Sequence, residues 1–308
     1  CDLCNIQEFE VIYDGVIRDG VVGIKTSINH KVVKCCGCGL VRLLNNPLTM
    51  EYYQSDEYRN AYNKTSNPSD YIEMHDNEQP PRLDKIGADF FRDKTVLDYG
   101  CGGGAFLDLV SGLSGTTLGV EPFSGYHDSL KRRGHEIFSD IESVQLKYND
   151  EVDSIVSFGV LEHVENPQQY LKDAYKLLKN GGKMYLETDN LNDILMKLNT
   201  NSFDEFFYRT AHLWYFEDKT LKQMAEQASF SDIKISFRHN FDMSNVMLWL
   251  RDNKPSGNGK LTFLNSSVDK NWIEFLESSG LTDFKKSLGV AVRPNLNPIK
   301  YSKTFLLL

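Results

Sequence analysis

The segment of residues 94–104, KTVLDYGCGGG, constrains the fold more than any other part of the 308-residue chain. A short apolar run with β-branched residues breaks at Asp98 into glycines at positions 100, 102, 103 and 104. This pattern predicts a buried strand over residues 95–99, a tight turn, and a helix that begins at Ala105. Glycines permit positive φ angles and the close approach of a ligand, and a helix N-terminus presents free amide groups. The segment therefore predicts a site for a nucleotide-like cofactor.

Apolar runs alternate with helical patterns through the middle of the chain. Strands are expected at residues 95–99, 116–121, 135–139, 153–158 and 183–188, and helices at residues 105–112, 124–133 and 167–179. Such alternation predicts an α/β fold with a Rossmann-like, doubly wound and mostly parallel sheet, which binds ligands beyond the carboxyl ends of its strands. A helix around Leu221 and strands over residues 232–238 and 287–293 are expected to complete the fold.

Three further segments follow the glycine turn in a fixed order. Glu121 ends the second strand about twenty residues on, where doubly wound folds place a carboxylate on the ribose hydroxyls. DSIVSFGVLEHVENP occupies residues 153–167, and LLKNGG occupies residues 177–182. With the glycine loop, these segments resemble the class I S-adenosylmethionine-dependent methyltransferases that carry an Asp-x-Gly-x-Gly-x-Gly loop, an "LEHV" segment and an "LK-x-GG" turn. The resemblance covers residues 94–237. An NAD-dependent oxidoreductase is the alternative because the glycines also satisfy the dinucleotide fingerprint, but that class does not require the two later segments.

The resemblance implies a site for S-adenosylmethionine at the carboxyl ends of the strands. Asp98 is expected to hold the amino group of the donor, directly or through water, and Glu121 to accept the ribose hydroxyls. The other expected members are Gly100, Gly102 and Gly104, which leave room for the amino-acid and ribose parts, Asp140 and Ile141 near the adenine, and Phe158 as a wall of the pocket. A capping role for Asp98 and a surface position for Glu121 are the alternatives.

Two histidines are candidates for proton transfer. The sulfonium donor is already activated, so the enzyme must chiefly align the reactants and exclude water. A hydroxyl or carbon acceptor must also lose a proton, which suits a histidine near neutral pH. His163 follows the strand over residues 153–158 and is the expected base, with Glu162 beside it as a further catalytic candidate. His212, in AHLWYF, is expected mainly to bind the acceptor. Each histidine also has a structural alternative. His163 would only brace its loop, and His212 would only pack against aromatic rings.

Five of the six cysteines lie in the first 38 residues. Cys1-x2-Cys4 and Cys35-x2-Cys38 have the spacing of two knuckles that supply four thiolates to one tetrahedral zinc ion. Two disulfides or a set of reduced buried thiols are the alternatives, and Cys36 is either a spare thiol or replaces Cys35. Because four thiolates leave no open position for water, the zinc is expected to be structural.

A narrower resemblance concerns the acceptor. A four-cysteine module ending in "CGL" at residues 38–40, the methyltransferase core and an "H-x-x-YF" segment at residues 212–216 look like the bacterial sugar methyltransferases that act on nucleotide-linked deoxysugars. The C-methylating enzymes carry Tyr-His-Glu-His before the aromatic pair, whereas this chain has YRTAH at residues 208–212. The resemblance implies that the acceptor is a nucleotide-linked sugar or a surface glycan precursor of polysaccharide biosynthesis, methylated at a hydroxyl or at a carbon.

Charge and hydropathy restrict the partners of the chain. Its formal net charge of -9 disfavours a nucleic-acid partner, because phosphate contacts need clustered Lys and Arg. An RNA or protein methyltransferase guided by the zinc ribbon remains an alternative. No apolar run reaches the roughly 18 to 20 residues that cross a bilayer, and no signal-peptide pattern opens the chain, so a cytoplasmic location is expected.

Three domains are expected. Residues 1–45 form the zinc-binding module, with strand character at residues 10–13, 20–24 and 31–34. Residues 46–93 form a tyrosine-rich linker or a lid over the cofactor, followed by one helix with Leu83, Ile86 and Phe90 on its inner face. Residues 94–308 form the methyltransferase domain, with insertions at residues 189–216 and, irregular in structure, at residues 240–285.

Overall fold

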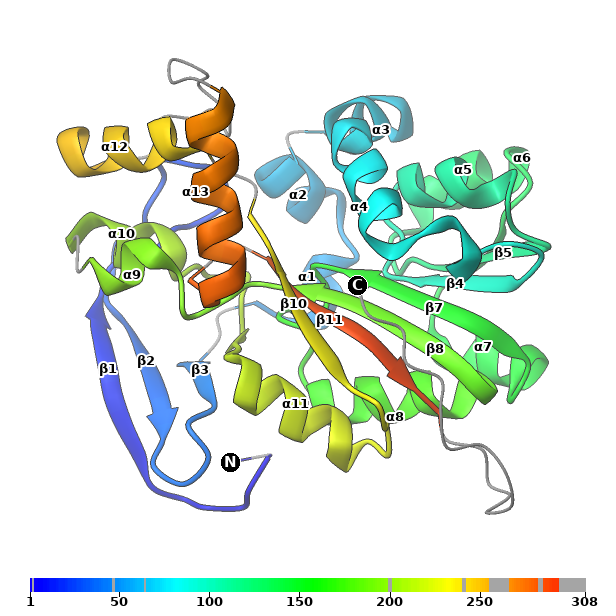
Figure 1. Cartoon of the computed structure of the whole chain (residues 1–308), viewed down its shortest axis with the longest axis horizontal. Helices are drawn as coiled ribbons and strands as arrows, with labels where there is room; N and C mark the ends of the chain where they lie inside the picture. The colour runs from blue at the N-terminus through cyan, green and yellow to red at the C-terminus, as the bar shows by residue number, and fades with distance from the viewer. Residues whose placement is uncertain are drawn as a thin grey trace.

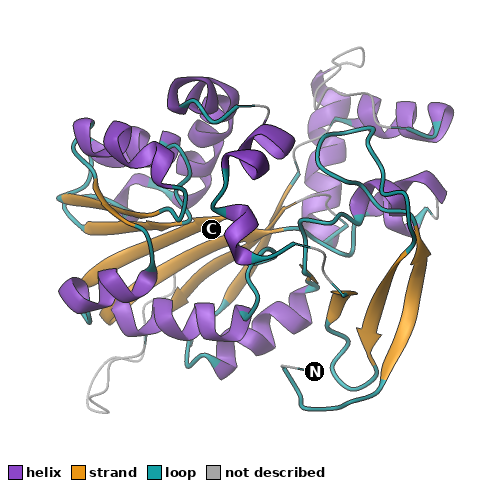
Figure 2. Ribbon diagram, turned by 180° about the vertical axis from the view of Figure 1, so that it is seen from behind, coloured by secondary structure: helices purple, strands orange, loops and turns teal. Residues whose placement is uncertain are grey.

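The structure is a computed structural model that describes residues 1, 3–45, 48–63, 65–198, 201–239, 242–254, 266–281 and 285–293. Within these residues the chain forms two β-sheets, one of seven strands and one of four. In Figure 2 the larger sheet lies between two layers of helices, and the smaller sheet lies to one side of it.

The larger sheet has the strand order β10-β11-β8-β7-β4-β5-β6. Its strands are β4 (Thr95–Tyr99), β5 (Thr116–Val120), β6 (Glu136–Phe138), β7 (Val152–Phe158), β8 (Leu178–Thr188), β10 (Lys234–Arg238) and β11 (Lys285–Val292). The five strands from β8 to β6 are parallel, whereas β11 runs antiparallel to both of its neighbours. The prediction of a Rossmann-like, doubly wound and mostly parallel sheet is therefore confirmed.

Helices cover both faces of this sheet. They are α4 (Gln79–Ile86), α5 (Ala105–Ser111), α6 (His127–Arg132), α7 (Ile141–Tyr148), α8 (Pro167–Leu177) and α11 (Asp218–Gln227). Figure 1 shows α4 and α5 on one face and α8 and α11 on the other. The central strands are apolar on both sides, as parallel strands buried between two helical layers must be, and Leu97, Leu118 and Ile155 are completely buried.

Local sequence signals predicted the start of helix α8 but not its end. Asn166 caps the helix as expected, because its side chain accepts a hydrogen bond from the amide of Gln169 at 2.9 Å, and Pro167 occupies the first turn. The expected end at residue 179 is wrong. The helix ends at Leu177, because Leu178 is already extended and pairs with Val152 of β7.

Several helices were not expected from the sequence, among them α7, α12 (Met243–Asp252) and α13 (Ser266–Ser279). The helix α7 fills the interval between β6 and β7, and Asp140 caps it by accepting from the amide of Ser143 at 2.8 Å. The insertion over residues 240–285 is not irregular where the structure describes it, since it contains α12 and α13. Its residues 240–241, 255–265 and 282–284 lie outside the described part, as do residues 294–308.

The four-stranded sheet combines the N-terminus with a distant part of the chain. Its order is β1 (Phe9–Gly15), β2 (His30–Cys35), β3 (Val41–Leu44) and β9 (Trp214–Tyr215), with antiparallel pairing throughout. The strand expected over residues 20–24 is absent, because these residues form turns between β1 and β2. The edge strand β9 lies in the segment that also carries α9 (Ile194–Lys197) and α10 (Asn201–Phe207). This sheet thereby joins the cysteine-rich module to the segment of His212.

The tyrosine-rich segment is mostly helical. It contains α1 (Met50–Tyr53), α2 (Asp56–Tyr58), η1 (Arg59–Asn63), α3 (Pro68–His75) and η2 (Asp76–Glu78) before α4. The single helix expected to include Leu83, Ile86 and Phe90 is wrong: Gly87, with φ of 87°, ends α4, and Phe90 lies in the separate turn η3 (Ala88–Phe90). Within the described residues no helix is long and apolar enough to cross a membrane. The three domain boundaries stay predictions.

Candidate functional site

A cavity of about 1000 Å³ lies at the carboxyl ends of the parallel strands. It is lined by the ends of β4, β5 and β7, by the tyrosine-rich segment, and by the loop at residues 18–22 of the N-terminal module. The residues proposed from the sequence that line it are Asp98, Gly100, Gly102, Glu121, Asp140, Ile141, Phe158, Glu162, His163 and His212. Residues far apart in the chain are thus brought to one site.

The glycine turn after β4 needs residues without a side chain, because of its backbone angles and its close neighbours. Gly100 and Gly102 have φ angles of 98° and 53°, which favour glycine, and a Cβ at Gly100 would collide with the side chain of Val160. Gly104 does not line the cavity. It is the N-cap residue of α5, with φ of 84°, and a Cβ there would collide with Leu130. Gly104 therefore serves helix packing, whereas Gly100 and Gly102 border the site.

Asp98 lies at the floor of the cavity and is 3% exposed. Burial raises the pKa of its carboxyl group to about 7, with Arg82 opposing and Glu121 adding to the shift. Arg82 comes from α4 and lines the same cavity, where its guanidinium lies 4.3 Å from the centre of the Phe158 ring. A carboxyl group and a guanidinium thus line the same cavity and influence each other electrostatically.

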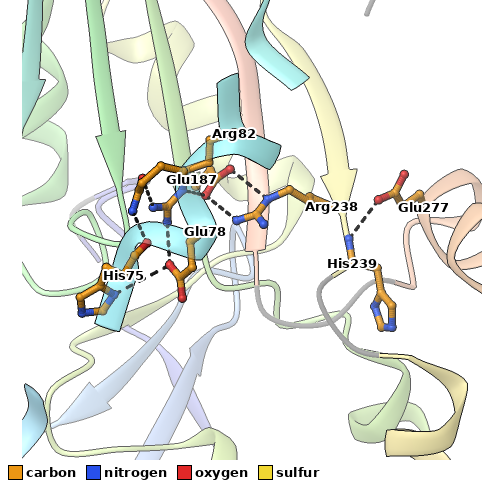
Figure 3. A network of polar contacts seen from close by, with 8 residues as sticks. His75, Glu78, Arg82, Glu187, Arg238, His239 and Glu277 are labelled. Atoms are coloured by element: carbon orange, nitrogen blue, oxygen red, sulfur yellow. Dashed lines mark hydrogen bonds and ion pairs between the residues drawn. The ribbon is translucent and has the colours of Figure 1, made fainter. Parts of the chain in front are cut away.

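A buried network fixes the position of Arg82 (Figure 3). Glu187 of β8 is completely buried and accepts from Nε of Arg82 at 3.1 Å. The same carboxylate accepts from Nε and Nη2 of Arg238, from β10, at 3.1 and 2.9 Å. Arg82 also donates to Gln79 at 2.9 Å. One carboxylate therefore ties helix α4 to two strands of the sheet and aims Arg82 at the cavity.

Glu121 is almost completely buried at the end of β5 and is held from two sides. Its Oε1 accepts from Nη2 of Arg59 at 2.5 Å and from the amide of Phe123 at 2.8 Å. Arg59 belongs to η1, so the tyrosine-rich segment reaches directly into the cavity. The surface position considered for Glu121 is wrong, since only 2% of the residue is exposed.

The two histidines also line the cavity, and their ring centres lie 4.7 Å apart with the rings nearly perpendicular. Nδ1 of His163 lies 2.6 Å from the carbonyl oxygen of Ala211. Because a carbonyl only accepts, this contact places the proton on Nδ1 and leaves the lone pair on Nε2. Burial, followed by the nearby Arg209, lowers the pKa of His163 to about 4.

His212 differs from His163 in its partner. Its Nδ1 lies 3.0 Å from Oδ2 of Asp189, and that same oxygen accepts from Nη2 of Arg209 at 2.6 Å. Burial lowers the pKa of His212 well below its usual value, and Asp189 opposes this shift. The contact has the distance of an ion pair but not the geometry of a hydrogen bond, so Asp189 stabilises the imidazolium through its charge when the ring takes a proton.

Glu162 completes the cluster. It accepts from the Thr188 hydroxyl at 2.8 Å, and burial, followed by the charge of Asp189, raises its pKa to about 7. Glu162, His163 and His212 each offer one ligand atom, and these atoms lie within 4.8 Å of one another. The cluster is therefore a compact group of proton-exchanging side chains with the spacing of a metal-binding group.

Three residues of the site were not singled out from the sequence. Asp189 directly follows β8, so the rule that ligands bind beyond the carboxyl ends of parallel strands could have found it. Arg82 and Arg59 come from segments that precede the sheet, and only the packing of these segments brings the two guanidinium groups to the cavity.

The four predicted zinc ligands lie together in the N-terminal module. Sγ of Cys1 lies 3.5 Å from that of Cys38, and Sγ of Cys4 lies 3.4 Å from that of Cys35. These separations exceed the disulfide length of about 2.05 Å and approach the roughly 3.8 Å expected for thiolates around one zinc ion. Cys36 is exposed and is not a member of the group, which favours Cys35 over Cys36 as the proposed ligand. The sulfur atoms fit a tetrahedral metal.

Comparisons with known proteins give a consistent family. A family model described as "Methyltransferase domain" matches residues 73–235. The ubiquinone biosynthesis O-methyltransferase of Coxiella burnetii is 30% identical over 107 residues, which are 33% of this chain and 46% of that protein. The mitochondrial ubiquinone biosynthesis O-methyltransferase of Candida albicans is 32% identical over 127 residues, which are 37% of this chain and 38% of that protein. The chain thus spans less than half the length of these curated relatives.

A solved structure has a similar fold at low sequence identity. Phosphoethanolamine N-methyltransferase 2 of Haemonchus contortus, solved in complex with S-adenosyl-L-methionine, superposes with a TM-score of 0.51 and 13% identity, over 83% of this chain and 62% of that chain. The match agrees with the family model in indicating a methyltransferase fold. The chain therefore belongs to the methyltransferase domain family, as a class I S-adenosylmethionine-dependent methyltransferase.

Proposed function

We propose that this protein transfers the methyl group of S-adenosylmethionine to an oxygen atom of a small polar acceptor, for which the hydroxyl of a nucleotide-linked sugar is the leading candidate. The observation that carries the proposal is the single cavity that Asp98, the glycine turn and Glu121 line together with His163 and His212. The names of the curated relatives, which are O-methyltransferases, support oxygen as the methylated atom.

The donor end of the cavity suits the three parts of the cofactor. S-adenosylmethionine, when bound, supplies the methyl group on an activated sulfonium. Asp98 would hold the amino group and Arg82 the carboxylate of the amino-acid part, because these two oppositely charged side chains line the same cavity and influence each other electrostatically. Glu121 would accept the ribose hydroxyls. Asp140 and Ile141 border the space for the adenine, and Phe158 forms a wall.

The contacts of the two rings favour His212 as the general base, although the sequence-based expectation was His163. A base becomes positively charged as it takes the proton, and Asp189 lies 3.0 Å from the ring of His212 to stabilise that charge. His163 has only the dipole of the Ala211 carbonyl at the equivalent nitrogen. His163 then positions the acceptor through Nε2, and buried Glu162 contributes a carboxyl group whose raised pKa keeps it partly protonated near neutral pH.

The acceptor class rests on polar groups that share the cavity. Arg18, Gln54 and Arg209 line it with the two histidines, and these side chains suit an acceptor rich in hydroxyl or phosphate oxygens. The four-cysteine module and the HLWYF segment favour a nucleotide-linked sugar. An acceptor of ubiquinone biosynthesis is the second candidate, which rests on the alignments with the curated relatives.

We also propose that Cys1, Cys4, Cys35 and Cys38 hold one zinc ion with a structural role. Their four sulfur atoms come within 4.8 Å of one another, and the amides of Gly37 and Cys38 point toward the sulfur of Cys35. Thiolates oriented by backbone amides are typical of structural zinc sites.

The direct test of the proposed function is a methyl-transfer assay with isotopically labelled S-adenosylmethionine. Nucleotide-linked sugars, ubiquinone-type phenols and RNA would be supplied as separate acceptor sets. We expect label in a sugar product, at an oxygen identified by mass spectrometric fragmentation. Label only in the phenols would favour the second candidate, and label in RNA would favour a nucleic-acid methyltransferase. No transfer to any set by protein that binds the cofactor would contradict the proposed acceptor chemistry.

A further inference from the structure

The tyrosine-rich cover, defined here as residues 50–63 and 65–78, forms one wall of the cofactor end of the cavity. Tyr58 and Arg59 border the cavity from α2 and η1, and Tyr71 and His75 border it from α3. Residues from both halves of the cover thus lie directly over the turn after β4 and the end of β5.

Arg59 attaches the cover to the sheet through both charge and aromatic contacts. Its guanidinium lies 5.4, 5.5 and 5.3 Å from the ring centres of Tyr58, Phe123 and Tyr126. One of its nitrogens lies 2.5 Å from Oε1 of Glu121, and only 9% of the residue is exposed. A guanidinium buried among three rings and paired with a buried carboxylate is held firmly, because breaking the pair would leave both charges without a partner.

The pair leaves part of Glu121 available to a ligand. Oε1 receives the guanidinium of Arg59 and the amide of Phe123. Among the described residues no side chain or amide donates to Oε2, and Glu121 lines the cavity. A ribose hydroxyl can therefore donate to Oε2 while Arg59 keeps its own bond to Oε1.

Tyr71 provides a second attachment of the cover. A Cβ placed on Gly102 or on Gly103 would collide with the Tyr71 ring, so the ring packs directly on the glycine turn. The ring also lies 5.2 Å from the ring of Tyr126. The cover consequently touches both the turn and the carboxylate that the cofactor is proposed to contact.

We propose that Arg59 is a positioning residue that couples cofactor binding to closure of the tyrosine-rich cover. By holding Oε1, Arg59 keeps the Glu121 carboxylate oriented with Oε2 toward the ribose, and a ribose bound there keeps Glu121 in place for Arg59. The bound cofactor and the closed cover then stabilise each other, since each favours the same arrangement of Glu121. This inference rests on the proposal that Glu121 holds the ribose.

The test measures S-adenosylhomocysteine binding by calorimetry and, in parallel, the hydrogen exchange of the cover. In the wild type we expect the ligand to protect amides of residues 50–78. Arg59→Gln should weaken binding by about ten- to a hundredfold, the scale of a lost charged hydrogen bond, and should abolish that protection. Arg59→Lys should restore part of both. The matched control is Arg92→Gln, at an exposed arginine that pairs with Asp89 far from the cavity lining.

The outcomes separate this inference from the proposed function. Unchanged affinity and unchanged ligand-dependent protection in Arg59→Gln would overturn the coupling, and tighter binding would mean that Arg59 competes with the ribose. Unchanged affinity in Glu121→Ala would instead remove the assignment of Glu121 itself. Hydrogen exchange of the β4 and β5 amides shows whether the sheet of each variant is folded. A variant that has lost its structure in general can therefore be distinguished from one that has lost only the coupling.

Discussion

At the scale of single residues, the site depends on what each buried group has as its partner. His163 and His212 are the same residue type in the same cavity, yet one faces a carbonyl and the other a carboxylate. Both histidines could be identified from the sequence, but Asp189 could not. Its role depends on contact with His212, and only the fold brings these two residues together. The cavity positions of Asp98, Gly100 and Glu121 were easier to predict, since these residues lie at or directly after strand ends.

We predict that His212→Asn and Asp189→Asn both lower turnover while cofactor affinity stays close to the wild-type value. Loss of a general base typically costs about 10² to 10⁴ in rate, or roughly 3 to 5 kcal/mol. Asp189→Asn keeps the shape of the side chain but removes the charge that stabilises the imidazolium. Steady-state kinetics with an identified acceptor, beside calorimetry with S-adenosylhomocysteine, check this.

His163→Ala is the informative comparison for that prediction. We expect it mainly to raise KM for the acceptor. A larger fall in kcat for His163→Ala than for His212→Asn would restore His163 as the base.

We predict that Glu162→Gln stabilises the protein at high pH but not at low pH. The pKa of Glu162 is raised to about 7 in the folded chain, above the roughly 4.3 of an unfolded chain. A raised pKa contributes stability below about pH 4, and this contribution is lost as the pH rises through 7. The glutamine does not titrate, so its Tm relative to the wild type should increase between pH 5 and pH 8.

The magnitude follows from linkage and is at most about 4 kcal/mol. Glu165→Gln, at an exposed position in the same loop, is the matched control and should show no such trend. A Tm difference between Glu162→Gln and the wild type that is independent of pH would mean that Glu162 is ionised at no cost in the folded protein.

At the scale of elements, local patterns predicted the parallel strands and failed where pairing is distant. The strands β4, β5 and β7 carry continuous apolar runs that end in turn residues, so their positions were predictable. Neither β3 nor β9 was expected, because each has few residues and depends on partners elsewhere in the chain. The segment over residues 20–24 has strand-like residues but forms a turn, which the antiparallel bridge between Arg18 and Lys25 closes. Strand propensity alone therefore gave a wrong prediction of the strands in the N-terminal module.

We predict that the N-terminal module holds about one zinc ion and loses its structure when the metal is removed. Thiolate binding of zinc contributes folding free energy to a module of this size. Elemental analysis should find the metal in protein purified without chelators. Cys38→Ser should release it, whereas Cys36→Ser should not, because Cys36 lies outside the group of four sulfur atoms. Full occupancy in Cys38→Ser would contradict the assigned ligands.

Metal removal is also expected to lower turnover. The strand β3 pairs with β9, where Val41 lies opposite Tyr215, and His212 precedes β9 by two residues. Unfolding of the module would remove that pairing and disturb the position of His212. Retained activity after complete removal of the metal would show that β9 keeps its place without the module.

At the scale of the whole molecule, the cavity is assembled from three stretches of sequence. The sheet supplies the part proposed to hold the cofactor, the tyrosine-rich cover lines that part, and the N-terminal module contributes the loop at residues 18–22. This arrangement could not be derived from the sequence. No local pattern in residues 1–45 or 46–93 indicates which part of the sheet each segment packs against. The resemblance nevertheless predicted the correct family.

We predict that Glu121→Ala weakens binding of S-adenosylhomocysteine by about 1.5 to 3 kcal/mol, since a hydrogen bond to a charged group is lost. Calorimetry measures the change directly. Asp128→Ala removes the same charge from an exposed position on α6 and is expected to bind like the wild type. Equal losses in the two variants would indicate a general effect of charge and not a contact with the ribose.

A crystal structure of the complex with S-adenosylhomocysteine tests the central claim most directly. The account predicts that the ligand lies in the cavity with its ribose on Glu121, its amino group near Asp98, and its sulfur toward the pair His163 and His212. A ligand bound outside this cavity, or one whose sulfur points away from both histidines, would contradict it.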